Sequence, residues 1–577
     1  MNLQFFNNIL NRIKMTFIPE HPLPVFDTNS YLDDRYKMLN KDQKVLINKI
    51  HINDKINIYI PTGTGKGFMM FFDILFNINK NLVDTIAIAS HRLNLNDQHG
   101  QDLFSILTPY AGDFGIIVVG SENITLKKEK LNGEKNKTYY DWLPYLKAKK
   151  TPLNSLIKRT TRNRDVVEWT KQFHNEGKKV IIITTYQSMD ALKGISIDKI
   201  YCDEAHTLAS ASEQSSFKDA YLSLNIKKSV FFTATPKDLS EKEDSSVSRF
   251  LMNNVEIFGV REGWKYGYCV EQGYIATPVI HLSSPSTPIV GKISIKDKAK
   301  FVKDSYLVHD KWVIENSLVK NMFRGKLLVK CAGVAEMWEV FSLLKKELPN
   351  VKIAAGASKG EGNSNDNHII GDKVFHKRNE YIEVLKSYND DEPLIVLHVM
   401  TMTEGINIDG LTGVLFLLEK LPTDKELLQN IGRAMRLHKQ DRDRMFSGLL
   451  EAKDKLNWVK SYCAVIIPYW DSSTHDNAKH IADKIKSISK TLDYEFYWGI
   501  VLGDDMPVGV AELELPFLNT PEKKKTKDLI EGIKHVIDDI EVIYANEKEV
   551  EEIEKVSNDG FNVVLKYVDE SSDGLFD

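Results

Sequence analysis

The chain has 577 residues, too many for one hydrophobic core, and this length predicts roughly three domains. Hydrophobic residues make up 42% and charged residues 27% of the sequence, which fits a soluble globular protein and excludes a fibrous or disordered class. The net charge of -4 excludes a uniformly basic chain, so any basic surface for nucleic acid has to be local.

The four cysteines are widely separated and form no CxxC pair, so neither a disulfide framework nor a zinc site is expected. This pattern fits a reducing compartment such as the cytoplasm. No apolar run approaches membrane-spanning length, and no membrane partner is expected. Residues 1–19 carry Arg12 and Lys14 without an acidic residue. We interpret this segment as an amphipathic helix packed on the body of the protein, with a targeting peptide as the alternative.

The stretch from Tyr31 to Ile50 predicts a helix that carries Gln43. The side-chain amide of a glutamine can both donate and accept hydrogen bonds, as recognition of an adenine edge requires. Gln43 lies a short way upstream of a glycine-rich loop, so we expect it to contact ATP. An ordinary solvated helix residue is the alternative, because the assignment depends wholly on position.

The sequence from Ile60 to Gly67, IPTGTGKG, is a glycine-rich turn between an apolar strand at residues 56–60 and an apolar helix at residues 68–76. Such a turn gathers backbone amides at the positive end of a helix dipole, which favours bound phosphate. Lys66 would add a mobile positive charge for the β- and γ-phosphates of ATP. The expected ATP-binding residues of this loop are Thr62, Gly63, Thr64, Gly65, Lys66 and Gly67.

Gly67 departs from the usual phosphate-loop pattern, in which a Ser or Thr after the lysine supplies a hydroxyl to Mg²⁺. A glycine-rich turn with an accidental lysine is therefore an alternative interpretation. Water could replace the missing hydroxyl ligand at some cost in affinity, so we expect ATP hydrolysis that is weakened but real.

Further apolar runs end in polar residues, which is typical of a parallel sheet covered by helices on both faces. The expected strands lie at residues 85–90, 116–119, 180–183, 199–202 and 229–232. The run at 199–202 leads into Asp203 and Glu204, and adjacent carboxylates there are costly unless a cation uses them. Asp203 would hold Mg²⁺, and Glu204 would orient and deprotonate the water that attacks the γ-phosphate. A solvated acidic turn is the alternative.

Three segments together resemble the first motor domain of superfamily 2 helicases: the phosphate loop, the DEAH tetrapeptide Asp203–His206 and the segment Thr233–Pro236. The DEAH order and the segment Glu271–Ile275 are more similar to the DNA-translocating, restriction-subunit-like (ResIII) branch, which includes viral, phage and plasmid helicases. The resemblance implies an α/β fold of two tandem RecA-like domains, parallel sheets covered by helices, with ATP and Mg²⁺ as cofactors. It also implies nucleic-acid contacts from Arg92, Thr185 and Thr403.

The second half of the chain predicts another RecA-like domain, with strands at residues 325–331, 394–399 and 414–417. The segment Thr403–Asn407 is similar to the fifth helicase motif and would bring Gly405 to the ATP. The segment Gln429–Arg436 matches the sixth motif, QxxGRxxR, at every defined position.

The spacing of Gln429, Arg433 and Arg436 predicts one helical face, from which two arginines could close over a γ-phosphate held by the other domain. An exposed basic helix laced with ion pairs is the alternative. The resemblance also implies that His206 pairs with Gln429.

The expected organisation is an N-terminal segment 1–40, a first RecA-like domain 41–280 with a basic insertion 121–179, a linker 281–320, a second domain 321–470 and an accessory C-terminal region 471–577. The insertion mixes basic and aromatic residues, which suits nucleic acid and equally suits a solvated helical insert. The acidic tail is expected to be a solvated end or a docking segment for a protein partner.

The resemblance implies an ATP-dependent helicase or translocase that moves along DNA and unwinds it. An RNA helicase in transcription or RNA processing remains open, because no motif discriminates the two tracks. A nucleotide-dependent clamp with little turnover also remains open, with Gly67 as its support. The expected location is the cytoplasm, or the host cytoplasm or virion for a viral protein.

Overall fold

The computed structural model describes residues 28–91, parts of 99–120, and 156–209, 216–236, 250–283, 293–316, 323–357, 367–376, 378–399, 408–418, 423–468 and short pieces up to residue 501. Its contacts divide the chain into two units. The first unit comprises Met1–Asn57, Gly67–Phe231 and Asp238–Val260, and the second comprises Ile58–Lys66, Phe232–Lys237 and Arg261–Asp577. The phosphate loop is therefore grouped with the second unit, while the rest of the helix that follows it is grouped with the first.

The first sheet has eight strands in the spatial order β4-β3-β5-β2-β6-β7-β1-β8. Strands β4, β3, β5, β2 and β6 run parallel to their neighbours. Every residue of β2 and β3 is buried, as expected for strands covered on both faces. The strands are β1 (Lys55–Tyr59), β2 (Thr85–Ser90), β3 (Phe114–Val119), β4 (Ile157–Thr160), β5 (Lys179–Thr185), β6 (Ser196–Asp203), β7 (Asn225–Thr233) and β8 (Val260–Gly263).

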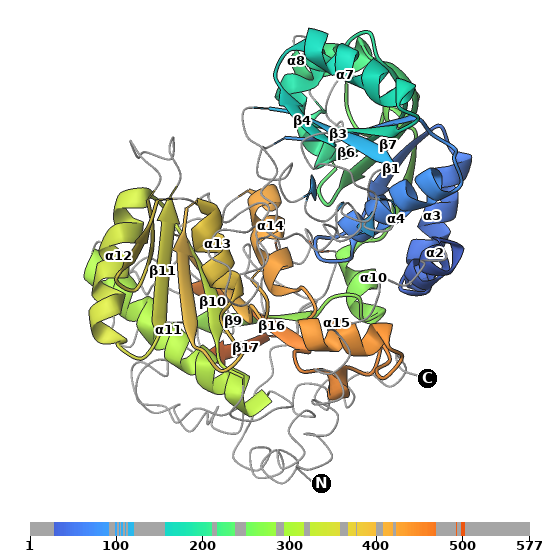
Figure 1. Ribbon diagram of the computed structural model, residues 1–577. Helices are drawn as coiled ribbons and strands as arrows, with labels where there is room; N and C mark the ends of the chain where they lie inside the picture. The colour runs from blue at the N-terminus through green and yellow to red at the C-terminus, as the bar shows by residue number, and fades with distance from the viewer. Residues whose placement is uncertain are drawn as a thin grey trace, which may run out of the picture. The chain divides into compact units, whose positions relative to one another are not determined.

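Helices cover both faces of this sheet, and α7 and α8 lie on the same side of it (Figure 1). One core cluster joins α7, α8 and η3 to the alternate strand residues Ile200 and Cys202 of β6, so Lys199, Tyr201 and Asp203 face the other side. The helices of this part are α2 (Thr28–Lys37), α3 (Lys41–Ile52), α4 (Lys66–Asn79), α7 (Asn163–Asn175), η3 (Tyr186–Leu192), η4 (Ala205–Thr207), α8 (Ser216–Leu222) and α9 (Val255–Phe258). Helix α10 (Tyr266–Glu271) belongs to the second unit, and its buried side chains join the core of the second sheet.

The second sheet has nine strands in the order β13-β12-β11-β14-β10-β15-β16-β9-β17. It is parallel except at one edge, where β11, β12 and β13 are antiparallel. The strands are β9 (Thr277–Ser283), β10 (Lys326–Cys331), β11 (Lys352–Ala357), β12 (Asn367–Ile370), β13 (Lys373–Phe375), β14 (Leu394–His398), β15 (Gly413–Leu417), β16 (Tyr462–Pro468) and β17 (Trp498–Val501).

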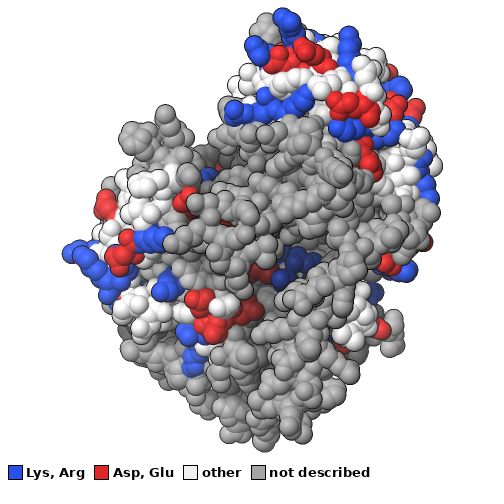
Figure 2. Space-filling view, viewed as in Figure 1, with Lys and Arg blue, Asp and Glu red and all other residues white. Residues whose placement is uncertain are grey.

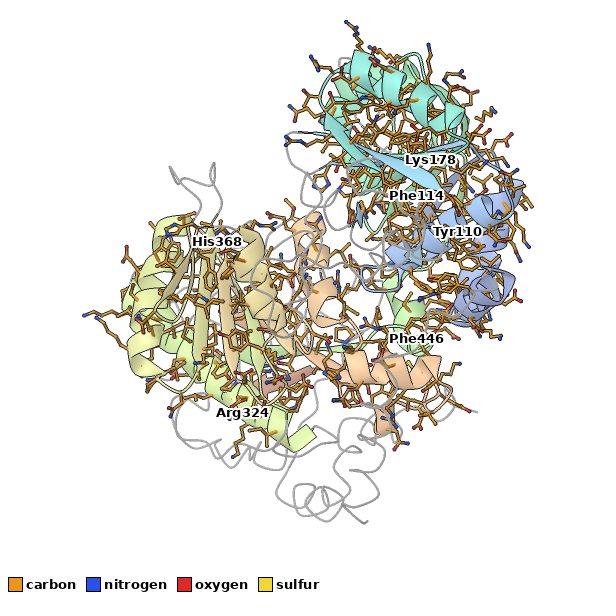
Figure 3. All side chains as sticks on the ribbon, viewed as in Figure 1. Tyr110, Phe114, Lys178, Arg324, His368 and Phe446 are labelled. Atoms are coloured by element: carbon orange, nitrogen blue, oxygen red, sulfur yellow. The ribbon has the colours of Figure 1, made fainter. Side chains whose placement is uncertain are left out.

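Helices α11 and α12 pack on one face of the second sheet, and α13 and α14 on the other (Figure 1). Their bounds are α11 (Ile295–Asn316), α12 (Val334–Glu347), α13 (Arg378–Lys386), α14 (Asp424–Ala434), α15 (Lys439–Phe446) and η5 (Lys455–Asn457). Arg324 lies just before β10 and His368 lies in β12, and the two residues are near opposite edges of the second sheet along the strand direction (Figure 3). The α/β class with two sheets covered by helices, predicted from the sequence, is confirmed.

The single helix expected over Tyr31–Ile50 is instead two helices, α2 and α3. Asn40 breaks the run because its side chain accepts a hydrogen bond from the backbone of Gln43, while the Gln43 side chain accepts one from the backbone of Asn40. This capping box starts a new helix at Lys41.

The expected linker over residues 281–320 contains a long helix. Helix α11 spans 22 residues, and its buried side chains Phe301, Val302 and Tyr306 join the core that α12 also lines. Strand β9 lies between β16 and β17 of the second sheet, although the first domain was expected to extend to residue 280. These residues are therefore part of the second sheet and its cover.

The expected basic insertion, residues 121–179, is described from residue 156 onwards, and this part belongs to the first sheet. It forms the edge strand β4 and helix α7, whose Val166 and Phe173 are fully buried in the core. The ammonium group of Lys158 lies 5.3 Å from the ring centroid of Trp169. The positive charge of Lys158 thus already has an aromatic partner within the protein. This favours the interpretation of this part of the segment as an ordinary structural insert over a nucleic-acid contact.

Basic and acidic side chains are intermixed on the face of the first unit that Figure 2 displays.

Of the helices that the structure describes, none is both long and apolar enough to span a bilayer.

Candidate active site

The phosphate loop closes on itself ahead of α4. The Thr64 hydroxyl donates to the Pro61 carbonyl at 2.8 Å, which holds the loop in a tight turn. Gly63 and Gly65 have φ angles of 95° and 89°, in the region that favours glycine because a Cβ would be strained there. The sequence therefore places glycine at the two positions of the turn that require it.

Lys66 begins α4, and its ammonium nitrogen is buried without a hydrogen-bond partner among the described residues. A buried, unpaired ammonium is costly unless an anion compensates it. The N-terminal end of α4 adds positive potential at the same place. This pairing of an orphaned cation with a helix N-terminus fits the phosphates of a nucleotide.

Strand β6 ends at Asp203, whose carboxylate and carbonyl are held by three neighbours. One carboxylate oxygen accepts a hydrogen bond from the Glu204 amide at 3.0 Å, and the other lies 3.1 Å from Nε2 of His99. The Tyr186 hydroxyl donates to the Asp203 carbonyl at 2.7 Å. Burial and the nearby carboxylates raise the pKa of Tyr186 well above its ordinary value, so this hydroxyl stays protonated and donates.

Glu204 has a φ of 52°, the left-handed conformation that residues other than glycine rarely adopt. Such a backbone costs on the order of 1–2 kcal/mol for an L-residue. Nδ1 of His206 lies 3.4 Å from the Glu204 carboxylate. Backbone strain of this kind tends to persist where it aims a functional side chain, and here it turns Glu204 away from the line of β6.

The donor set at the end of β6 fits Mg²⁺ bound mainly through a nucleotide. Among the described residues, no three His, Cys, Asp or Glu side chains converge on one point. Mg²⁺ in nucleotide sites usually keeps several waters and takes one or two carboxylates together with substrate phosphates. Asp203 would be the protein ligand in such a site.

The sixth-motif segment is only partly helical, which corrects the single face expected for Gln429, Arg433 and Arg436. Helix α14 ends at Ala434, so Arg436 lies beyond it. The ammonium group of Lys460 donates to the Ala434 carbonyl at 2.5 Å, and the Ala276 amide donates to the Met435 carbonyl at 2.7 Å. These outside donors take the last carbonyls of the helix, which allows the chain to leave it before Arg436.

The second unit, which includes the phosphate loop, brings that loop to the sixth-motif segment. A Cβ at Gly63 would lie 2.8 Å from Cγ of Arg436, and one at Gly432 would lie 3.0 Å from the Cβ of Thr62. Tyr266, in α10, has its hydroxyl 3.4 Å from the Thr62 amide nitrogen. A side chain at position 63 would therefore displace Arg436, and one at position 432 would crowd Thr62.

Arg433 is buried, and its positive charge contributes to the local electrostatics at the end of β14. Burial lowers the pKa of His398 well below its ordinary value, and the charges of Lys330 and Arg433 lower it further. His398 is therefore neutral beside this guanidinium.

Several predicted site residues have other partners or lie outside the described residues. Gln43 is buried and its amide oxygen belongs to the capping box of α3. Thr185 is 5% exposed and donates to the Ser188 hydroxyl at 3.1 Å, so a nucleic-acid contact through its side chain would require this turn to open. Arg92, Thr403 and Gly405 lie outside the described residues. The pairing of His206 with Gln429 stays a prediction.

Sequence reasoning missed three residues that contact the predicted site: His99, Tyr186 and Tyr266. His99 and Tyr186 meet Asp203 from elements that precede β6, and Tyr266 meets the phosphate loop from 204 residues further along the chain. Tyr186 directly follows the polar end of β5, which was the one local signal that could have indicated it.

Comparison with protein families finds a match over residues 36–238 to the family described as the res subunit of type III restriction enzymes. The expected resemblance to the restriction-subunit-like branch is therefore confirmed for this segment. No curated protein sequence matches the chain.

Solved structures of superfamily 2 enzymes resemble the fold. An ATP-dependent type ISP restriction-modification enzyme bound to DNA matches with a TM-score of 0.52 and 16% identity, covering 90% of this chain and 33% of that one. A DEAD-box helicase bound to single-stranded RNA matches with a TM-score of 0.47 and 14% identity, covering 96% of this chain and 89% of that one. The helicase Lhr of Mycobacterium smegmatis, bound to single-stranded DNA, matches with a TM-score of 0.45 and 13% identity, covering 90% and 55%.

The chain thus spans about a third of the length of the type ISP enzyme. At this level of identity the likeness concerns the fold alone. The tandem RecA-like architecture predicted from the sequence is confirmed.

Proposed function

We propose that this chain is an ATP-dependent nucleic-acid helicase or translocase, with duplex DNA as its track. The observation that carries the proposal is the Lys66 ammonium, buried at the start of α4 without a partner among the described residues. The dipole of α4 and the glycine-rich turn before it favour an anion at that place. A nucleotide phosphate is the anion that this combination suits best.

The proposed chemistry is attack of water on the γ-phosphate of ATP. Lys66 and the amides of the loop hold the β- and γ-phosphates, and Thr62, Gly63, Thr64, Gly65 and Gly67 complete the loop. Asp203 would bind Mg²⁺, which would neutralise charge that develops on the phosphates. Glu204 orients the attacking water and takes its proton, and its left-handed backbone supports a functional role for this residue.

Arg433 and Arg436 are proposed to contact the γ-phosphate as charge builds up during its transfer. The close approach of Arg436 to Gly63 supports this role for Arg436. His206 and Gln429 are proposed to pair, and Gln43 and Gly405 to contact the nucleotide. Arg92, Thr185 and Thr403 are proposed to contact the phosphates of the track, without dependence on its sequence.

The domain organisation belongs to the same proposal. The nucleotide site is assigned to the two RecA-like domains, approximately residues 41–280 and 321–470. Residues 471–577 are proposed to dock a protein partner, apart from β17, which extends the second sheet.

The test is a strand-displacement assay on matched DNA and RNA duplexes that carry single-stranded ends. We expect ATP-dependent displacement of DNA by the wild-type chain, and loss of displacement in Lys66→Ala and Glu204→Gln. Equal displacement without ATP, or by Lys66→Ala, would refute the proposal. Displacement of RNA alone would replace the DNA track by an RNA track.

A nucleotide-dependent clamp with little turnover is a second candidate, and Gly67 is the observation that favours it. The missing hydroxyl removes one Mg²⁺ ligand, which slows hydrolysis more than binding. Retention on single strands that depends on ATP, without release of phosphate, would favour the clamp over the motor.

A further inference from the structure

Helix α4 carries a buried carboxylate on the face that also carries Lys66. Asp73 is fully buried, and it lies seven residues after Lys66, which is close to two helical turns. The two side chains therefore point to the same side of the helix. Asp73 stands in the apolar run Phe68–Phe76, where an unpaired charge would not be tolerated.

Three hydrogen-bond donors and one imidazole ring, from three elements, surround this carboxylate. One oxygen of Asp73 accepts hydrogen bonds from the Lys199 ammonium at 2.5 Å and from the Tyr201 hydroxyl at 2.6 Å. The other accepts one from the Asn77 amide at 3.1 Å and lies 3.4 Å from Nε2 of His51. The side chains of Lys199 and Asp73 are 2% and 0% exposed, so water does not screen the pair.

Both β6 partners of Asp73 lie on the face of β6 that presents Asp203. Side chains alternate along a strand, so Lys199, Tyr201 and Asp203 share one face. The residues between them, Ile200 and Cys202, face the core cluster on the other side. Asp73 thus ties α4 to the same face of the same strand that ends in the proposed Mg²⁺ ligand.

A network of this kind is not explained by stability alone. Apolar residues of similar volume often replace a buried ion pair without loss of stability, because removing two charges from water offsets their attraction. What a charged, hydrogen-bonded pair adds is one defined register between the elements it joins. Burial and the Asp73 charge raise the pKa of Tyr201 well above its ordinary value, so its hydroxyl remains a donor.

We propose that Asp73 is a positioning residue, which holds α4, and with it Lys66, in register against the strand that ends at Asp203. The inference rests on the proposed ATP site and adds a role for a residue that does not touch the nucleotide. Helix α3, which carries Gln43, joins the same network through His51. One carboxylate therefore connects three elements that bear proposed nucleotide-binding residues.

The test replaces the ion pair by apolar side chains, in the double variant Asp73→Leu/Lys199→Met. Its matched control is Lys298→Met/Glu336→Leu, which removes a 2.6 Å ion pair between α11 and α12, far along the chain from the site residues. Thermal unfolding, the kcat and KM for ATP, and the Mg²⁺ concentration for half-maximal hydrolysis are measured for both. Mg²⁺-dependent affinity for a fluorescent ATP analogue is measured as a readout that needs no turnover.

We expect the double variant to unfold within a few degrees of the wild type yet to lose roughly tenfold in kcat, since small misplacements of reacting groups are costly. Its Mg²⁺ requirement should rise severalfold while KM changes little. The control should match the wild type in every readout. Wild-type kcat and Mg²⁺ dependence in the double variant would overturn the inference and leave the proposed function intact.

Three further outcomes keep the test decisive. If the double variant fails to fold, Tyr201→Phe removes one hydroxyl from the network without changing the ring, and it should shift the Mg²⁺ requirement in the same direction by a smaller factor. No shift in Tyr201→Phe would then count against the inference. A wild-type chain that binds the analogue without hydrolysing it refutes the motor, and the Mg²⁺ dependence of its affinity still decides the role of Asp73. A wild-type chain that binds no analogue refutes both.

Discussion

Two buried clusters, one in each unit, hold ionisable groups in different ways. In the first unit the fully buried Asp73 forms an ion pair with Lys199, with Tyr201 and Asn77 as further donors. The buried ionisable groups of the second unit include two histidines. His281, in β9, and His309, in α11, pack against the ring of Trp312 with centroid distances of 5.0 and 5.8 Å.

These histidines are kept neutral. Burial lowers the pKa of His281 to about 4, and burial together with the neighbouring His281 lowers that of His309 to about 3. Neutral rings pack without a specific ionic partner, although His309 lies 2.8 Å from the Thr412 hydroxyl. In the first of these clusters an ion pair joins α4 to β6, whereas in the second two neutral histidines pack against an aromatic ring.

The largest effect is expected when only one partner of the charged pair is removed. Asp73→Leu leaves the Lys199 ammonium buried without its carboxylate, which should lower the free energy of unfolding by about 3–5 kcal/mol. Urea unfolding measures it. Glu336→Leu is the matched control, and it should cost less because the side chain of its partner Lys298 is 10% exposed. Equal losses of unfolding free energy in the two variants would mean that the Asp73 network stabilises the fold no more than the ion pair between α11 and α12.

The neutral histidines should make the second unit sensitive to acid. The folded-state pKa of His281 is about 4, below the value of about 6.5 in an unfolded chain, so the unfolded state binds the proton more readily. Stability is therefore complete above pH 6.5 and falls as the pH drops toward 4, by on the order of 3 kcal/mol. His281→Phe should flatten this part of the profile of melting temperature against pH.

The first unit provides a milder counterpart to this acid sensitivity. Burial also lowers the pKa of His51, while the Asp73 charge opposes the shift. His51→Gln should therefore flatten the same profile less than His281→Phe does. An equal or larger effect of His51→Gln would contradict the contrast between the two units.

A smaller effect is expected from the strained backbone at the end of β6. Glu204→Gly removes the left-handed strain and should stabilise the chain. The gain should be no more than about 1 kcal/mol, because the greater conformational freedom of glycine in the unfolded chain offsets part of it. It should abolish ATP hydrolysis at the same time. Asn81 has a similar φ of 54°, and asparagine tolerates this conformation, so Asn81→Gly should change the melting temperature less. Destabilisation by Glu204→Gly would show that its side-chain contacts outweigh the strain.

The smallest effect on stability concerns the helix that begins at the phosphate loop. A Cβ at Gly67 would lie 3.6 Å from Cε2 of Phe71, an ordinary contact, so a Cβ is accommodated there. Gly67→Ala should stabilise α4 by about 0.5–1 kcal/mol through helix propensity. Gly67→Thr adds a hydroxyl and should lower the Mg²⁺ concentration needed for hydrolysis relative to Gly67→Ala. Identical Mg²⁺ requirements in the two variants would refute our account of this position.

Local signals predicted the strands that carry the proposed site. The strand expected at residues 85–90 coincides with β2, and the apolar run before Asp203 belongs to β6. These elements were predictable because a buried parallel strand is a continuous apolar run and its polar residues gather at one end. The glycines of the phosphate loop likewise follow from local backbone geometry.

Features that depend on distant partners were not predictable. Asp73 is a single polar residue in an apolar helix, and its partner Lys199 lies 126 residues away in sequence. The end of α14 before Arg436 depends on donors from Lys460 and from Ala276, which the spacing of the arginines cannot reveal. Helix α11 did carry a local signal that was missed, because its buried residues Ala299, Val302, Tyr306 and Val313 are spaced by three, four and seven residues.

The most direct measurement is the rate of phosphate release from ATP by the wild-type chain, with Mg²⁺, in the presence and absence of single-stranded DNA or RNA. The account predicts a rate that requires Mg²⁺, rises when a strand is added and falls to background in Lys66→Ala. A rate no higher than that of buffer under every condition, or one that Lys66→Ala leaves unchanged, would contradict it.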